Sequence, residues 1–225
     1  MCGRYGRRSD KQRIAEWFHT RNTDVFDEST YAPSYNVAPM TFQPVVRLNR
    51  ETGEREIAYM RWGLVPFWSK DSKPSYSTVN AKAETITVNA TFREAMKGRR
   101  CLVPADFFYE WQKIDAKRKQ PYAIGMRDGT MFAFAGLWER WKDKTSGNTL
   151  ETFTVITTDP NELMEDSQSY ACHPQTEGLR PVAGTRGPAA SACRSAQAVS
   201  SRADEVMEGR QRCRQCQKRQ SQSVR

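Results

Sequence analysis

The sequence predicts an α+β protein that is rich in β-structure, with a barrel-like, curved antiparallel sheet and a few peripheral helices. Two observations favour this fold class. Short runs of alternating, β-branched or aromatic residues recur along roughly the first 160 residues, and Gly-containing turn signals separate several of them. Helical spacing of apolar residues is rare by comparison. Many short strands with few helices are typical of barrel-like folds.

The first predicted element is a helix over residues 9–19. Ser9 or Asp10 would serve as its N-cap, because both side chains can accept a hydrogen bond from the first helical turn. Apolar side chains then recur at helical spacing, at Ile14, Trp17 and Phe18. We expect this helix to pack on the core.

A β-hairpin is predicted next. Residues 35–40 form an extended segment that leads into an alternating run at residues 45–48. Residues 49–54 include Gly53 and predict the turn, and residues 57–62 predict the returning strand.

The second half of the predicted fold follows a short helix that ends at Gly98. A buried strand is expected at residues 101–105, in which Cys101 would be an inert core thiol. Further strands are predicted at residues 122–126, 131–137 and 152–158, with turns at residues 128–129 and 146–148.

Composition narrows the class of protein. A chain of 225 residues suffices for one domain with a real core, and its net charge of +9 suggests a polyanionic partner. No apolar run approaches the roughly 20 residues of a membrane span, and the start lacks a signal-peptide core. We therefore expect a cytoplasmic, nucleoid-associated protein with reduced cysteines and no membrane partner.

The first residues, Met1-Cys2-Gly3-Arg4-Tyr5, carry the strongest chemical signal. Removal of Met1 would leave Cys2 as a 1,2-aminothiol, whose amine and thiol are both partly deprotonated near neutral pH. Such a group can condense with an aldehyde to a five-membered thiazolidine, so the expected target is a carbonyl. The alternative is that Cys2 is only an early residue of a frayed terminus. Gly3 allows close backbone approach and Arg4 can bind phosphate, which favours the reactive interpretation.

Glu110 is the candidate general acid or base, because four aromatic residues surround it in the sequence: Phe107, Phe108, Tyr109 and Trp111. A carboxyl group in apolar surroundings tends to have a raised pKa, which suits proton transfer at neutral pH. The alternative is a carboxylate on the solvent face of an aromatic strand.

Two tryptophans interrupt the strand pattern around Gly63 and Pro66. Aromatic side chains in loops beside basic residues can stack on unpaired bases. For Trp62 we favour a buried plug under a loop, whereas Trp68, close to Lys70 and Lys73, is the better candidate for stacking.

Six short blocks, taken together, closely resemble the SOS-response-associated peptidase (SRAP) family of abasic-site processing proteins. The resemblance covers residues 2 to about 165, and its blocks occur in order at residues 2–5, 35–39, 61–66, 80–85, 101–106 and 108–111.

The resemblance implies a β-barrel-like domain that binds single-stranded DNA and crosslinks covalently to abasic sites, whose opened sugar presents an aldehyde. Cys2 would be the nucleophile, after autocatalytic removal of Met1. Asn80 would orient the opened sugar by hydrogen bonding, and Glu110 would transfer protons during ring opening and Schiff-base formation.

The resemblance also implies a DNA-binding set. Arg4 and Lys82 would hold flanking phosphates, with Lys82 standing where many members carry Arg. An apolar wedge and stacking surface would comprise Pro39, Met40, Trp62 and Trp68. The expected partner is single-stranded DNA with an abasic site, bound by a monomer that needs no cofactor or metal.

The chain departs from the family after residue 165, so we expect an SRAP-like domain at residues 1–165 and an atypical tail at residues 166–225, disordered or frameshifted. The family continues into an Ile-His-x-Arg-Met-Pro motif whose His completes the active site. Here that His is absent.

A frameshift would explain the departure. A permitted set of codons for residues 166–174, read one base later, encodes Ile-His-Asn-Arg-Met-Pro-Val-Ile. Permitted codons for residues 205–225, read in the same shifted frame, encode a sequence that resembles the family's usual ending and then a stop. Resequencing the gene across the codon of Met164 tests this hypothesis, which an intact frame with different codons would refute.

Three other functions compete with covalent crosslinking. The chain could bind single-stranded DNA without catalysis, since the binding residues remain while the family His is missing. The tail could hold zinc through Cys213 and Cys216 with Cys193, Cys172 or His173, although one CxxC pair is a weak signal. A plain cysteine peptidase would need a Cys-His pair, and neither histidine lies in a recognisable motif.

Overall fold

The structure is a computed structural model that describes residues 3–20, 32–73, 75–126 and 128–158, together with two short strands at residues 170–171 and 179–181. Cys2, the rest of the tail and its candidate zinc ligands lie outside the described residues.

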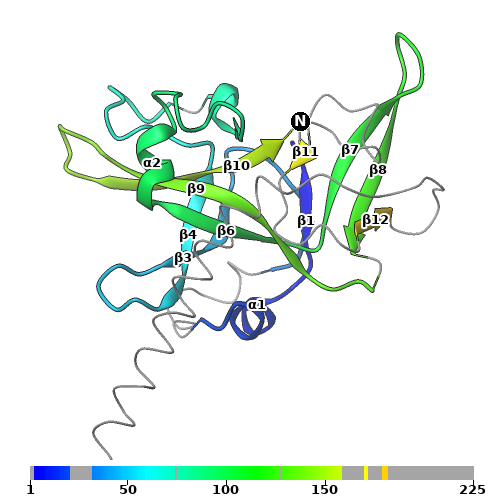
Figure 1. The fold of residues 1–225 in the computed structure, drawn as a ribbon, viewed down its shortest axis with the longest axis horizontal. Coiled ribbons are helices and arrows are strands. Elements are labelled where there is room, and N and C mark those ends of the chain that lie inside the picture. The colour runs from blue at the N-terminus through cyan, green and yellow to red at the C-terminus, as the bar shows by residue number, and fades with distance from the viewer. Residues whose placement is uncertain are drawn as a thin grey trace, which may run out of the picture.

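Five strands close into a small barrel (Figure 1). Strand β10 hydrogen-bonds both to β9 and to β4, so the order β10-β4-β3-β6-β9 returns to its starting strand. These strands are β3 (Phe42–Leu48), β4 (Arg55–Trp62), β6 (Arg100–Ala105), β9 (Phe132–Lys142) and β10 (Thr149–Thr158). The predicted β-rich, barrel-like fold is confirmed.

One detail of the predicted sheet is wrong: it is not antiparallel throughout. β10 runs parallel to β4 and to the short strand β5 (Asn80–Lys82). Parallel neighbours need a long connection, and the chain between β4 and β10 supplies one that includes the five strands β5 to β9. The other strand pairs within the described residues are antiparallel.

A second sheet covers the barrel, in the order β12-β8-β7-β1-β2. Its strands are β1 (Tyr5–Arg7), β2 (Ser34–Val37), β7 (Phe107–Lys113), β8 (Lys119–Met126) and β12 (Leu179–Pro181). Tyr5 and Phe108 of this sheet both pack on Phe134 of the barrel, with ring centroids 5.8 Å away in each case. The two sheets therefore share one main core.

Part of the atypical tail joins these sheets. β11 (Tyr170–Ala171) pairs with the end of β10, and β12 pairs with β8. Because β12 comes from residues beyond 165, backbone of the tail extends the five-stranded sheet.

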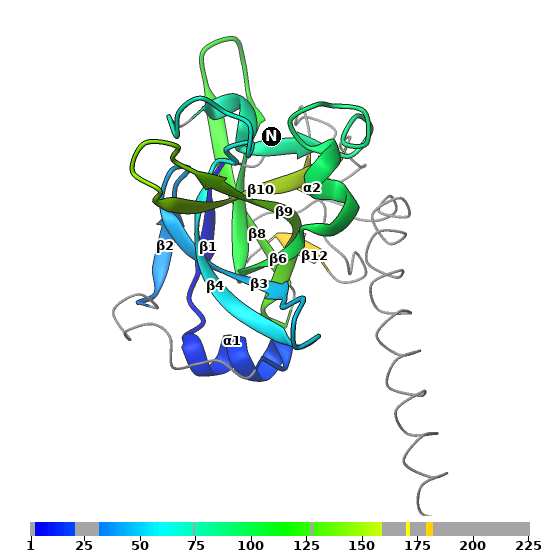
Figure 2. The ribbon, with the colours of Figure 1, turned by 90° about the vertical axis from the view of Figure 1, so that its left-hand side faces the viewer.

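Helix α1 (Lys11–Phe18) lies at one end of the molecule, as both ribbon views show (Figures 1 and 2). The Asp10 side chain caps it by accepting a hydrogen bond from the Arg13 backbone N–H at 2.8 Å, and His19 ends it in the left-handed region. Ile14 and Phe18 pack against the outside of the barrel, as predicted. Trp17 does not join them, since its side chain is 47% exposed.

Several other local predictions are confirmed, although residues 39–40 form a turn where an extended segment was predicted. The β3–β4 hairpin pairs Val46 with Ile57 and turns at Gly53, whose φ is +70°. Helix α2 (Arg93–Gly98) ends where expected, and a 3-10 helix, η2 (Tyr76–Thr78), precedes β5. Cys101 is buried in β6, and burial raises the pKa of its thiol well above the ordinary range, so this thiol is inert.

The pairing of β1 with β7 depends on a glycine. Gly6 lies opposite Phe107, and a Cβ atom at position 6 would lie 2.1 Å from Cζ of the Phe107 ring. Gly6→Ala is therefore expected to destabilise the fold by about 1–3 kcal/mol, the usual cost of overpacking. Urea unfolding measures this loss. The same substitution in a Phe107→Ala background should cost much less, and an equal cost there would show that the ring is not the cause.

Candidate functional site

The main core brings together three strands that carry predicted site residues. Tyr5, Val79 and Phe108 are all buried in this core, and the Tyr5 ring lies 5.4 Å from that of Trp62. Each of these three core residues lies next to or near a predicted site residue: Arg4 precedes Tyr5, Asn80 follows Val79, and Glu110 is two residues beyond Phe108. The shared core therefore brings Arg4, Asn80 and Glu110 into one region of the molecule. Figure 1 shows the start of β1 and the end of β10, beside which β5 pairs, on the same side of the molecule.

Glu110 points inward. Side chains alternate along β7, and Glu110 is only 5% exposed, on the same face as buried Phe108. The alternative of a carboxylate on the solvent face is therefore wrong. Glu110 is therefore a carboxyl group with little access to water.

The start of strand β1 pairs with β7 two residues from Glu110. The Tyr109 N–H donates to the Arg4 carbonyl at 2.9 Å, and Tyr5 pairs with Phe108. Continuing this antiparallel register by two residues would place Gly3 opposite Glu110.

Asn80 faces the same core. It pairs with Val155 of β10, and directly paired residues share one face of a sheet. Val155 is fully buried in the main core, so the Asn80 side chain is on the core side of β5. Lys82, two residues on, pairs with Thr157 on that same face and is exposed at the end of the strand.

The peptide that precedes Asn80 is held by three donors. The Val79 carbonyl accepts hydrogen bonds from the Trp62 indole N–H (2.9 Å), the Thr154 hydroxyl (3.0 Å) and the Val155 N–H (3.1 Å). These bonds fix the backbone position of Asn80. Sequence reasoning missed Thr154, because nothing distinguishes this residue from the other threonines of its strand.

Trp62 does not contribute to a stacking surface, which corrects the expectation carried by the resemblance. Its side chain is 0% exposed and stacks within the core on Phe153, with ring centroids 6.2 Å apart and planes 9° from parallel. The buried-plug interpretation of Trp62 is confirmed.

Pro39 and Met40 form a half-buried turn over the Trp62–Gly63 backbone. Met40 adopts a positive φ of +69°, and its N–H donates to the Trp62 carbonyl at 2.9 Å. The Met40 sulfur lies 3.0 Å from the position that a Cβ atom of Gly63 would occupy. Gly63, at φ +117°, allows this close approach.

Trp68 is 55% exposed on a loop that the barrel holds in place. The Trp141 indole donates to the Ser69 carbonyl at 2.9 Å, and the Arg61 guanidinium donates to the Ser72 carbonyl at 2.8 Å. The loop presents the Trp68 ring to solvent in a defined place, which suits base stacking.

Arg4 directly precedes β1 and is partly exposed. Its guanidinium donates to the Asn36 amide oxygen at 2.9 Å, which orients the charged group at the edge of the second sheet. Among the described residues, the candidate site therefore has two positively charged side chains, Arg4 and Lys82. Its other members are Pro39, Met40, Trp68, Asn80 and Glu110.

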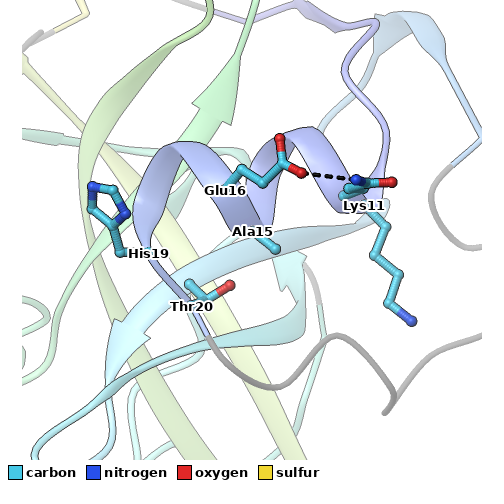
Figure 3. A pocket seen from close by; sticks show the side chains of 6 residues that line it. Lys11, Ala15, Glu16, His19 and Thr20 are labelled. Carbon is cyan, nitrogen blue, oxygen red and sulfur yellow. Dashed lines mark hydrogen bonds between the residues drawn. The ribbon is translucent and has the colours of Figure 1, made fainter.

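A separate hollow of about 530 Å³ lies along α1 (Figure 3). Lys11, Ala15, His19 and Thr20 line it, together with Gln12 and Glu16, which are joined by a hydrogen bond of 2.8 Å. No predicted site residue lines this hollow, and α1 lies at the opposite end of the molecule from the start of β1. We assign it no part in the site.

Known proteins resemble this chain over the part that holds the site. The family model "SOS response associated peptidase (SRAP)" matches residues 1–169. The chain is 45% identical over 167 residues to the abasic site processing protein YoqW of Bacillus subtilis. This alignment covers 74% of this chain and 72% of YoqW. It is 35% identical over 182 residues to the abasic site processing protein HMCES of Xenopus tropicalis, covering 69% of this chain and 53% of HMCES.

A solved structure supports the same grouping. A crystal structure of a protein from Bacteroides thetaiotaomicron superposes with a TM-score of 0.70 at 28% sequence identity, covering 78% of each chain.

Within the described residues, no helix is long and apolar enough to cross a membrane. The fold, the motif order and the extent of the family match lead to one conclusion: this chain belongs to the SRAP family.

Proposed function

We propose that this chain attaches itself covalently to abasic sites in single-stranded DNA through Cys2. The amine of Cys2 attacks the C1′ aldehyde of the opened sugar and forms a Schiff base with loss of one water molecule. The thiol then adds across the C=N bond, so that sulfur bonds to C1′ and the thiol proton passes to nitrogen. The product is a thiazolidine, and the aldehyde is no longer exposed to other reactions.

The single observation that carries this proposal is the buried Glu110 side chain on β7, the strand with which β1 pairs. Dehydration to a Schiff base requires a proton for the leaving hydroxyl group, and sugar opening requires proton transfer at the ring oxygen. A carboxyl group that is only 5% exposed can exchange these protons with little competition from water. Asn80, on a backbone held by three hydrogen bonds to the preceding carbonyl, would orient the sugar.

The flanking DNA would contact the surface around this centre. Arg4 and Lys82 would bind phosphates, Trp68 would stack on a base, and the Pro39–Met40 turn would separate bases at the lesion. Names of the relatives, which specify abasic site processing, support this choice of substrate. We further propose autocatalytic removal of Met1, action as a monomer, and a cytoplasmic, nucleoid-associated location.

The test uses the full chain with Met1 confirmed absent by mass spectrometry, mixed with a single-stranded oligonucleotide that carries one abasic site. A band that survives a denaturing gel is expected, and Cys2→Ala should remove it. Cys101→Ala is the matched control: this buried thiol has no route to the DNA, so its band should persist. A Cys2→Ala protein that crosslinks as fast as wild type would refute the proposal.

The second candidate function is non-covalent binding of single-stranded DNA, favoured by the absence of the family His from this sequence. A variant with residues 166–225 replaced by the shifted reading frame restores that His. Crosslinking by this variant alone, with equal DNA affinity in both proteins, would assign the chain as written to the binding function.

A further inference from the structure

The β7–β8 hairpin projects from the body of the molecule, beyond the start of β1, in both ribbon views (Figures 1 and 2). Its far end, residues 113–119, contains four basic residues and one acidic residue. The basic residues are Lys113, Lys117, Arg118 and Lys119, and the acidic residue is Asp115. This part of the hairpin therefore has a net charge of +3, by subtracting one from four.

Asp115 is already engaged within the turn. Its carboxylate accepts hydrogen bonds from the N–H groups of Lys117 (2.9 Å) and Arg118 (2.8 Å) and from Arg118 Nε (2.7 Å). These bonds lower the pKa of Asp115, with the Lys117 backbone bond as the main cause. Arg118 is neutralised locally, and the charges of Lys117 and Lys119 are left facing solvent.

Lys119 begins β8, two residues after Lys117, and Asp115 is the one acidic residue in the sequence of residues 113–119. A polyanion bound at the hairpin would therefore meet net positive charge that the turn itself does not neutralise.

The hairpin also connects directly to the proposed reaction centre. Glu110 and Lys113 belong to the same strand, and three residues of strand span about 10 Å. That distance corresponds to about three base steps at the 3.4 Å per step of a duplex strand. A DNA strand with its lesion near Glu110 can therefore reach the hairpin with only a few flanking nucleotides.

We propose that the β7–β8 hairpin binds the phosphate backbone of the single-stranded DNA that flanks the lesion. This inference rests on the proposed function and extends it: Lys117 and Lys119 recruit the strand while the centre around Glu110 reacts with the sugar. The contact is electrostatic and independent of base sequence.

The test compares K117Q/K119Q with wild type on two substrates, a strand of about 20 nucleotides with a central abasic site and an abasic trinucleotide too short to reach the hairpin. On the long strand, the slope of log rate against log salt should fall by about 1.4, from two phosphate contacts at about 0.7 each. If the two proteins react at the same rate at 1 M salt, this change in slope makes the variant's second-order crosslinking rate about 25-fold lower at 0.1 M salt. The trinucleotide rate should not change.

The matched control is K142Q/K144Q, which removes the same charge from exposed positions at the β9–β10 turn. This variant should retain the wild-type rates on both substrates. An equal loss in the control, an equal loss on the trinucleotide, or no loss on the long strand would overturn the hairpin proposal.

A further measurement separates this proposal from the proposed function. Equilibrium binding of a lesion-free strand of about 20 nucleotides does not require Cys2 chemistry. If wild type fails to crosslink, covalent attachment is refuted. The hairpin proposal then stands if K117Q/K119Q alone lowers the salt slope of binding, and falls if both variants bind like wild type.

Discussion

Glu110→Gln is expected to slow crosslinking by about 10²- to 10⁴-fold, the range associated with loss of a positioned general acid or base. The amide is nearly isosteric and can still donate and accept hydrogen bonds, but it cannot exchange a proton with the leaving hydroxyl group. Because Glu110 lies inside the core and Arg4 and Trp68 lie outside it, DNA affinity should remain close to that of wild type. Single-turnover rates at saturating protein, with affinity measured on a lesion-free strand, separate the two effects.

Glu139→Gln is the matched control for this substitution. Glu139 is a second buried carboxylate, 4% exposed on β9, and accepts a hydrogen bond from Arg99 at 2.7 Å. Its loss should lower stability without changing the crosslinking rate of the folded protein. If Glu110→Gln reacts at the wild-type rate, or if both substitutions slow the reaction equally, Glu110 is not the proton-transfer group.

Asp106→Ala is expected to destabilise the fold by about 3–5 kcal/mol, the largest single loss of stability that we anticipate. Asp106 is 2% exposed and accepts hydrogen bonds from the N–H groups of Arg8 (2.6 Å) and Ser9 (3.0 Å) and from the Ser9 hydroxyl (2.9 Å). These bonds tie the junction between β6 and β7 to the segment between β1 and α1. Removal of the carboxylate leaves buried donors without an acceptor. Urea denaturation at neutral pH measures the loss.

Asp115→Ala shows whether burial is the reason. The Asp115 carboxylate also accepts three hydrogen bonds, but it lies in an exposed turn where water can replace them. Its removal should cost far less than removal of Asp106. Equal losses would mean that burial is not the reason for the cost at Asp106.

The chemical groups of the candidate site could be predicted from the sequence more readily than their arrangement in space. The position of Cys2 behind Met1 and the aromatic setting of Glu110 are readable from a few adjacent residues. The inward direction of Glu110 is not, because both faces of β7 carry aromatic side chains and hydrophobicity therefore does not identify the buried face. Trp62 was ambiguous for a similar reason, since a tryptophan before a glycine suits either a loop surface or a core.

The sequence by itself determined the local elements: a helix capped at Ser9 or Asp10, the hairpin turn at Gly53 and the strands on either side of it. Caps, turns and side-chain periods depend on residues a few positions apart. Only the tertiary structure decided how β10 closes the barrel against β4 and how Asn80 and Glu110 come to face inward. These arrangements depend on strand register and on contacts between distant segments, and no local pattern encodes which of several similar strands will pair.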